Sequence, residues 1–138
     1  SLLLVEMPLV GWTSHMCDTL SILNSHKEIT VILAHIERYR ALQNQDAVRR
    51  IRKAGASVQI NCESILGKTG FRTKHFCQKL LKEKLVDLIA SDAHNTDQRQ
   101  VHMRESMTLV EKKYGSAEVE RIFAQNPESL FYIEEKGA

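Results

Sequence analysis

The chain has 138 residues, of which 43% are hydrophobic and 26% are charged, and it carries a formal net charge of +2. This is the composition of an ordinary globular protein, long enough for one domain, and it excludes a disordered chain. The small net charge gives no reason to expect nucleic-acid binding, and no apolar run approaches the roughly 20 residues that membrane insertion requires.

Four short apolar runs predict four β-strands. They begin near Leu2, Thr30, Ser57 and Val86, at an almost even spacing of about 28 residues. Each gap between these runs has the apolar spacing of an amphipathic helix. The first helix follows a cap at Thr13 or Ser14. The second spans residues 45–54 before a C-cap at Gly55, and the third spans residues 74–84 after a cap at Thr73.

Helices are also predicted beyond the fourth run. Residues 99–114 place Met103, Val110 and other apolar residues on one face. A further helix follows Ser116, and Asn126 with Pro127 predicts the N-cap and first turn of another short helix.

This order predicts an α/β fold of repeated βα units around a parallel sheet. Polar residues follow each strand at the carboxyl edge, where barrel-type α/β enzymes build their sites. A closed eight-unit barrel takes ~250 residues, so two alternatives remain: an open α/β domain, or half of a barrel. Because the chain begins abruptly inside an apparent strand with Ser1, we expect the C-terminal half of a distorted TIM-like barrel, a single domain over residues 1–138 that is incomplete at its N-terminus.

The strand ends carry candidate metal ligands. Residues 86–94, Val-Asp-Leu-Ile-Ala-Ser-Asp-Ala-His, form an apolar run that ends in Asp92 and His94. Glu6 and His35 follow two other apolar runs and should converge on Asp92 and His94. Mixed imidazole and carboxylate ligation suits Mn, Fe or Zn, whereas a structural zinc site would favour Cys. These four residues predict the metal centre of a phosphoesterase.

Two arginines are candidate phosphate ligands. Arg38 follows His35 on a loop and offers a planar guanidinium to two phosphate oxygens. Arg99 opens the helix after Asp92 and could reach the same anion, aided by the helix N-terminus. We expect Glu37 to orient Arg38 or to pair with another cation. His102 falls near the site by position.

The cysteines predict reduced thiols and a cytoplasmic location. Cys17, Cys62 and Cys77 are odd in number, far apart and without a Cys-x-x-Cys pair. None begins the Cys-x5-Arg loop of cysteine phosphatases. We therefore expect small buried hydrophobic residues rather than a catalytic thiol.

Three segments closely resemble motifs of the bacterial manganese-dependent protein-tyrosine phosphatases of the polymerase-and-histidinol-phosphatase (PHP) superfamily, which act in capsular and exopolysaccharide synthesis. They are Ile-Leu-Ala-His-Ile-Glu-Arg-Tyr at 32–39, Asn-Cys-Glu-Ser-Ile-Leu-Gly at 61–67 and Ile-Ala-Ser-Asp-Ala-His-Asn at 89–95. The resemblance runs from Glu6 to about Leu130.

The resemblance implies a PHP barrel with two or three manganese ions that hydrolyses phosphotyrosine on a partner tyrosine kinase. It assigns the metal ligands to Glu6, His35, Asp92 and His94, and the phosphate arginines to Arg38 and Arg99. The family's N-terminal His-x-His segment is absent, so its full metal cluster cannot form from these residues alone, and we expect this fragment by itself to be inactive. Ile36 replaces the usual Pro, and Cys62-Glu63 replaces an Ala-Gly pair.

Two other functions remain open. One is a small-molecule phosphatase of the histidinol-phosphate type. The other is a non-catalytic assembly or kinase-docking module. Since an edge strand at residues 2–6 would expose apolar surface, we also expect self-association and a homo-oligomer.

Overall fold

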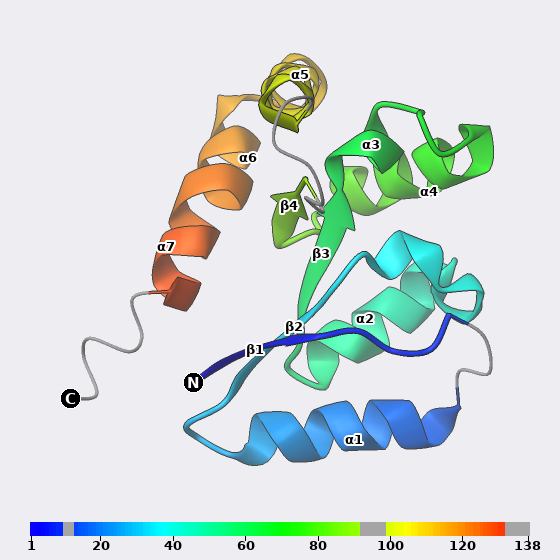
Figure 1. Cartoon of the computed structure of the whole chain (residues 1–138), viewed down its shortest axis with the longest axis vertical. Coiled ribbons are helices and arrows are strands. Elements are labelled where there is room, and N and C mark those ends of the chain that lie inside the picture. Colours follow the sequence, from blue (N-terminus) through cyan, green and yellow to red (C-terminus); the bar gives the residue numbers. More distant parts are fainter. Residues whose placement is uncertain (10–12, 92–98, 132–138) are drawn as a thin grey trace.

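The computed structural model describes residues 1–9, 13–91 and 99–131, except for the side chains of 99–101. Four strands form one parallel sheet in the sequential order β1-β2-β3-β4 (Figure 1). The strands are β1 (Leu2–Val5), β2 (Thr30–Leu33), β3 (Ser57–Asn61) and β4 (Leu88–Ala90). The predicted α/β architecture of repeated βα units is therefore confirmed, and only the fourth strand begins later than expected.

The connections between strands contain the three predicted helices and three shorter elements. The helices are α1 (Ser14–Ser25), α2 (Gln45–Lys53) and α4 (Phe71–Lys82). The shorter elements are the 3-10 turns η1 (Ile36–Arg38) and η2 (Arg40–Leu42), and α3 (Cys62–Ile65). Figure 1 shows α1 below β1 and β2, α2 overlapping β1 in this view, and α3 beyond the carboxyl end of β3 with α4 beside it.

Local signals explain the bounds of α2. The side chain of Asn44 accepts a hydrogen bond from the backbone N–H of Ala47 at 2.8 Å, which caps the helix start. Gly55 follows the helix with φ +96°, a left-handed conformation that glycine adopts without steric cost.

The predicted start of α4 was wrong. Thr73 is not the cap, because the helix begins at Phe71 and Gly70 is its N-cap. The N–H of Lys74 already donates to the carbonyl of Gly70 at 3.1 Å. Gly70 has φ +116°, so a backbone turn at glycine starts the helix in place of a threonine hydroxyl.

The short helix predicted at Asn126 is present as α7, but Asn126 is not its N-cap. After α5 (Arg99–Tyr114), the helical elements α6 (Ser116–Glu120), η3 (Arg121–Gln125) and α7 (Asn126–Phe131) follow without a gap. Asn126 has helical angles, and its side-chain amide donates to the carbonyl of Asp87 at 2.8 Å. Pro127 is tolerated because η3 is a π-helical segment, which changes the hydrogen-bond pattern in the turn that the proline ring approaches.

The two faces of the sheet are packed differently. Val31, Leu33, Val58 and Ile60 are completely buried in the main core, which contains residues of α1, α2 and α4. The opposite face borders a mainly apolar hollow of about 520 Å³. Its lining includes Leu4, Ile32, Gln59, Leu88, Met103, Phe123 and Phe131. Within the described ranges, no helix is long and apolar enough to span a membrane.

Asp87 organises the amino end of the sheet, opposite the predicted site. Its carboxylate accepts a hydrogen bond from the N–H of Val58 at 2.8 Å and two from the guanidinium of Arg52, at 2.9 and 3.2 Å. Its own N–H donates to the carbonyl of Val58 at 2.9 Å. These bonds replace ladder pairing just before β4, which accounts for the late start of that strand.

Candidate active site

Glu6 and His35 lie side by side at the carboxyl end of the sheet. Val5 pairs with Leu33, and the N–H of Ala34 donates to the carbonyl of Val5 at 3.0 Å, so the residues that leave β1 and β2 are held together. His35 Nε2 is 3.3 Å from Glu6 Oε1. The imidazole is 5% exposed and the carboxylate 65% exposed. The pair therefore has one face closed by the protein and one open to solvent.

His35 has a strained backbone. With φ +35° and ψ +58°, it lies in the left-handed region, which non-glycine residues seldom occupy. Its Nδ1 is buried and has no hydrogen-bond partner among the described residues. A strained, buried imidazole with an unsatisfied nitrogen is typical of a functional site rather than of a turn that serves only packing.

The described donors fit part of a metal centre. A carboxylate beside an imidazole is a donor set that suits manganese, iron or zinc. In the described ranges, no group of three or more His, Cys, Asp or Glu residues is placed to hold an ion. The other two predicted ligands, Asp92 and His94, lie outside the described residues. The metal assignment for all four therefore stays a prediction.

Glu37 fixes the turn that presents His35 and Arg38. It is 1% exposed, and its Oε1 accepts hydrogen bonds from the N–H of Asn61 at 2.8 Å and from Ser64 Oγ at 2.7 Å. Burial raises the pKa of this carboxyl above its ordinary value, and the two hydrogen bonds oppose that rise. Of the two expected roles, these bonds favour orientation of the Arg38 turn, and no ion pair of Glu37 with a Lys or Arg is present in the described part of the chain.

Tyr39 holds the same turn from the other side. Its hydroxyl accepts a hydrogen bond from the N–H of Met7 at 2.9 Å, and its ring lies against the His35 ring with 5.6 Å between centroids. Burial raises the pKa of the Tyr39 phenol. Ile36 is completely buried between these anchors. The turn is thus supported from both flanks, although Ile36 stands where a proline was expected.

Arg38 is exposed and lines a polar cavity of about 830 Å³. Its walls come from η1, η2, β3, α3 and the start of α4. The lining residues are Glu37, Arg38, Arg40, Gln43, Asn61, Glu63, Ser64, Thr69, Arg72 and Thr73. Sequence reasoning missed Arg40 and Arg72, because α4 brings Arg72 here from a distant part of the chain. Thr69, in the loop before α4, also lines the cavity.

The other predicted residues are less fully described. Arg99 is the first residue of α5, and its side chain lies outside the described part of the structure. His102 has a buried Nδ1 without a hydrogen-bond partner among the described residues. Cys62 and Cys77 are completely buried, which confirms the predicted packing role of these two residues. Their burial raises the pKa of both thiols.

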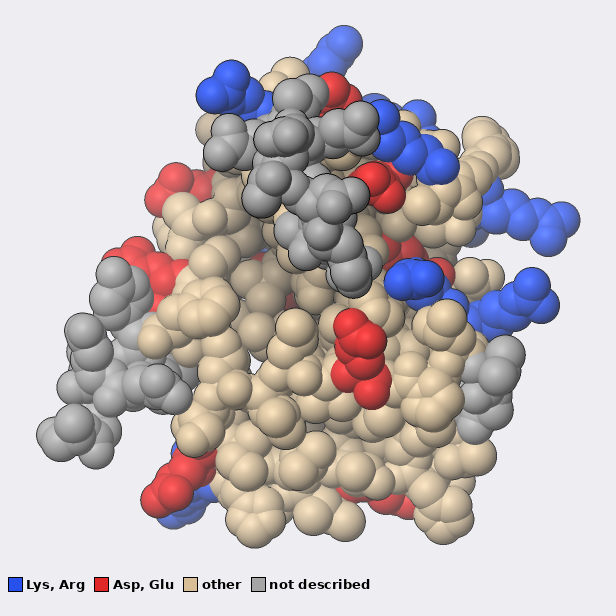
Figure 2. Space-filling model, viewed as in Figure 1, with Lys and Arg blue, Asp and Glu red and all other residues tan. Residues whose placement is uncertain are grey.

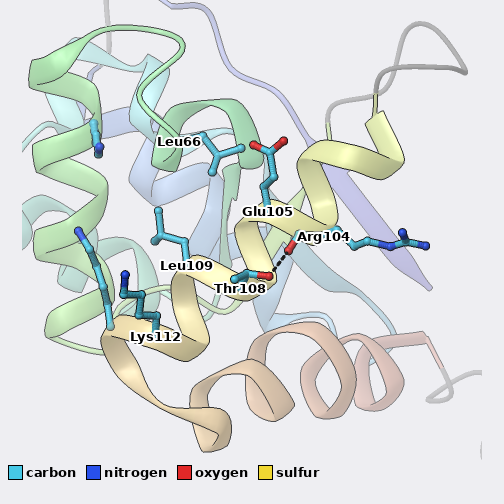
Figure 3. Close-up of a pocket in the computed structure, with 8 residues that line it drawn as sticks. Leu66, Arg104, Glu105, Thr108, Leu109 and Lys112 are labelled. Carbon is cyan, nitrogen blue, oxygen red and sulfur yellow. Dashed lines mark hydrogen bonds between the residues drawn. The ribbon is translucent and has the colours of Figure 1, made fainter.

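A second hollow lies between α4 and α5. Figure 3 shows Leu66, Glu105 and Leu109 around this space, with Arg104 directed away from it. Its volume is about 690 Å³, and Lys74, Lys112 and Lys113 add positive charge at its walls. No predicted site residue lines it, and it contains no imidazole. It is therefore separate from the candidate active site.

Comparisons with known proteins find relatives of similar sequence. The chain is 36% identical over 108 residues to the tyrosine-protein phosphatase CpsB of Streptococcus pneumoniae, covering 74% of this chain and 44% of that protein. It is 34% identical over 100 residues to the tyrosine-protein phosphatase YwqE of Bacillus subtilis, covering 72% and 39%. The chain thus spans less than half the length of these relatives.

A solved structure shares the fold. It belongs to the crystal structures of YwqE from Bacillus subtilis and CpsB from Streptococcus pneumoniae, described as unique metal-dependent tyrosine phosphatases. The TM-score is 0.79 at 27% identity, over 96% of this chain and 52% of the solved one. The family model for capsular polysaccharide synthesis, CpsB/CapC, matches residues 2–132. Since that match covers nearly the whole chain, this protein belongs to the CpsB/CapC family of capsular polysaccharide synthesis proteins.

Proposed function

We propose that this chain is the C-terminal part of a PHP-type, metal-dependent protein-tyrosine phosphatase. The observation that carries the proposal is the close pair of His35 and Glu6 next to the arginine-lined cavity of Arg38. Two relatives named as tyrosine-protein phosphatases, and a solved structure described as metal-dependent, support it. The sequential parallel sheet is also the arrangement of consecutive barrel strands.

The proposed roles follow from the chemistry of the side chains. Glu6 and His35, with Asp92 and His94, would hold two or three manganese ions, which when bound supply a Lewis acid and activate water for attack on phosphorus. Arg38 and Arg99 would neutralise the charge on the phosphate oxygens. Glu37 and Tyr39 would keep the His35–Arg38 turn in position. A phenolate, with pKa ≈ 10, leaves without a strong general acid.

The family suggests the biological setting. We propose a cytoplasmic enzyme whose substrate is a phosphotyrosine protein, namely a cognate bacterial tyrosine kinase of capsule or exopolysaccharide synthesis. Leu3 and Leu4 of the edge strand β1 are 40% and 61% exposed. This apolar edge supports a homo-oligomer or pairing with the rest of a barrel.

The first test separates metal ligands from other histidines. In a protein of the full length of the relatives, His35→Asn removes the imidazole but keeps a residue that tolerates left-handed angles. Manganese content and phosphotyrosine-peptide turnover should both fall, whereas His15→Gln on exposed α1 should leave both unchanged. Asp92→Ala should behave like His35→Asn. Normal manganese content in both ligand variants would remove these residues from the metal centre.

A second test separates phosphate binding from metal binding. Arg38→Lys keeps the positive charge but loses the bidentate guanidinium. Manganese content should stay normal while kcat/KM for a phosphotyrosine peptide falls on the order of 10²-fold, the scale for one preorganised donor. Loss of metal instead would make Arg38 a support of the His35 turn.

The same assays decide between the proposed function and its two alternatives. Turnover of histidinol phosphate but not of the peptide would favour a small-molecule phosphatase. If no variant or wild-type protein binds manganese, the non-catalytic docking function is favoured.

A further inference from the structure

The polar cavity beside Arg38 is larger than a phosphate group requires. Its volume of about 830 Å³ is within the usual range for sites that enclose a whole small ligand or a peptide segment. Beyond Arg38 the walls continue to Arg40 of η2 and to Arg72 in the first turn of α4. The groups adjacent to a phosphate held at Arg38 would therefore also contact the cavity walls.

The charge of the lining is positive. Three arginines face one exposed acid, Glu63, while Glu37 is buried and hydrogen bonded to Ser64 and Asn61. Neither the Arg40 nor the Arg72 side chain forms an ion pair or hydrogen bond with another described residue. Figure 2 shows the same trend at larger scale, because Lys and Arg gather on the side where Figure 1 places α3 and α4.

Two arginines of α2 have protein partners. Arg49 pairs with Asp46 and Glu83, and Arg52 pairs with Asp87. The guanidinium groups of Arg40 and Arg72 remain available to an anion that comes from outside. Planar guanidinium groups bind carboxylates in bidentate pairs, so acidic side chains suit them well.

The start of α4 adds to this positive field. α4 has 12 residues, its N-cap is Gly70 without a side-chain cap, and its first turn contains no acid. Its first N–H groups thus lack the acidic partners that commonly stabilise a helix N-terminus. Asn61, Ser64, Thr69 and Thr73 supply amide and hydroxyl groups along the same walls, and such groups can pair with a peptide backbone.

We propose that this cavity binds acidic residues adjacent to the phosphotyrosine of a protein substrate, with Arg40 and Arg72 as the residues that determine this specificity. The proposal rests on the proposed function, because it takes Arg38 as the contact to the phosphate. It adds a substrate class: phosphotyrosine in an acidic sequence.

The experiment is a binding measurement with this chain and does not depend on turnover. Three fluorescein-labelled peptides are compared by anisotropy: phosphotyrosine with Glu and Asp neighbours, phosphotyrosine with Ser and Gly neighbours, and the acidic peptide with Phe in place of phosphotyrosine. Wild type should prefer the acidic phosphopeptide over the neutral one on the order of tenfold, as expected for one or two charge-assisted contacts.

Variants assign that preference to the cavity. Arg40→Gln together with Arg72→Gln should bring the preference close to one. Arg50→Gln, a matched change of an exposed arginine on α2, should leave it intact. Circular dichroism checks that each variant is folded. If the double variant is unfolded, the same measurement is made with each single variant. An unchanged preference in the double variant, or none in wild type, would overturn the proposal.

The peptides also separate the two levels of inference. If phosphotyrosine adds affinity but acidic neighbours do not, the proposed function stands and the acidic subsite is wrong. If the acidic Phe peptide binds as well as the acidic phosphopeptide, and the double variant abolishes both, the subsite stands while the phosphotyrosine assignment fails. Heparin serves as an acidic polysaccharide. If heparin binds more tightly than the acidic phosphopeptide and the double variant abolishes its binding, the ligand of the cavity is an acidic polysaccharide and the proposal is overturned.

Discussion

Two carboxylates, Glu37 and Asp87, stand at opposite ends of the same sheet and are satisfied to different degrees. Asp87 accepts three hydrogen bonds, from Arg52 and Val58, through both of its oxygens. Glu37 is more deeply buried, yet only one of its oxygens has partners, Asn61 and Ser64, in the described part of the chain. The amino end of the sheet is thus closed by complete pairing, whereas the carboxyl end keeps unsatisfied polar atoms.

This difference agrees with a division of labour in barrel-type α/β proteins, which place function at the carboxyl end and stability at the amino end. At the carboxyl end the left-handed His35, whose Nδ1 has no partner among the described residues, is a local cost that the packed turn must offset. At the amino end both carboxylate oxygens of Asp87 accept hydrogen bonds. Four sets of variants, in order of decreasing expected effect, test whether the two ends differ in this way.

Asp87→Ala should have the largest effect on stability. It removes three hydrogen bonds and leaves the N–H of Val58 without its side-chain acceptor, so we expect the free energy of unfolding to fall by about 3 kcal/mol. Urea denaturation followed by circular dichroism measures it. Asp46→Ala, which breaks an exposed pair with Arg49 on α2, is the control and should cost far less. Equal losses of unfolding free energy in the two variants would show that the hydrogen bonds of Asp87 do not stabilise the sheet more than an exposed ion pair does.

Glu37→Ala should cost about 2 kcal/mol, because the buried N–H of Asn61 loses its acceptor. Glu37→Gln keeps an oxygen in that position and should retain most of the stability. In the same urea series, the alanine variant should also weaken binding of the neutral phosphotyrosine peptide, since the turn that carries Arg38 is released. If Gln and Ala destabilise equally, the hydrogen-bond geometry is not what holds the turn.

Two glycines give a comparison of backbone strain at the two ends. Gly55, before β3, has φ +96°, and an added Cβ would lie 1.8 Å from Asn24 Nδ2. Gly70, beside the polar cavity of Arg38, has φ +116°, and no atom lies within 4 Å of the position that an added Cβ would take. Alanine should cost about 1 kcal/mol at Gly70 from strain alone. Gly55→Ala should lower the melting temperature further, because α1 must also shift, and equal shifts would contradict this close approach.

Much of the fold was predictable because its signals are local. The first three strands begin where the apolar runs begin, and Gly55 ends α2 as its sequence position indicated. The convergence of Glu6 and His35 was predictable too, since neighbouring parallel strands end at one edge. In each case a few adjacent residues carry the information.

The failures involve residues whose partners are distant in sequence. Glu37 and Asn61 are 24 positions apart, and Val58 and Asp87 are 29 apart. No periodic pattern links such pairs, so the sequence did not predict that Glu37 accepts hydrogen bonds from Asn61 and Ser64. Asn126 had the same difficulty: the sequence predicted a cap, but its side chain donates to the distant carbonyl of Asp87.

The smallest predicted effect tests the outer part of the amino-end network by pH. Arg121 donates to both carboxylate oxygens of Glu118, at 3.0 and 2.8 Å, and to the carbonyl of Val86 at 2.9 Å. The hydrogen bonds from Arg121 lower the pKa of Glu118 below its ordinary value of 4.5. A lowered carboxyl pKa stabilises the fold at pH values above 4.5, and this stabilisation is lost as pH falls through the folded-state pKa.

Glu118→Gln should therefore reduce stability at neutral pH by no more than about 1 kcal/mol, because Arg121 is partly exposed to solvent. The difference from wild type should shrink as urea midpoints are measured at pH values below 4.5. Glu111→Gln, an exposed acid on α5, should show no such pH-dependent difference. If the Glu118 difference instead grows on acidification, the Arg121 bonds do not favour the ionised carboxylate. The complete pairing at the amino end would then stop at Asp87.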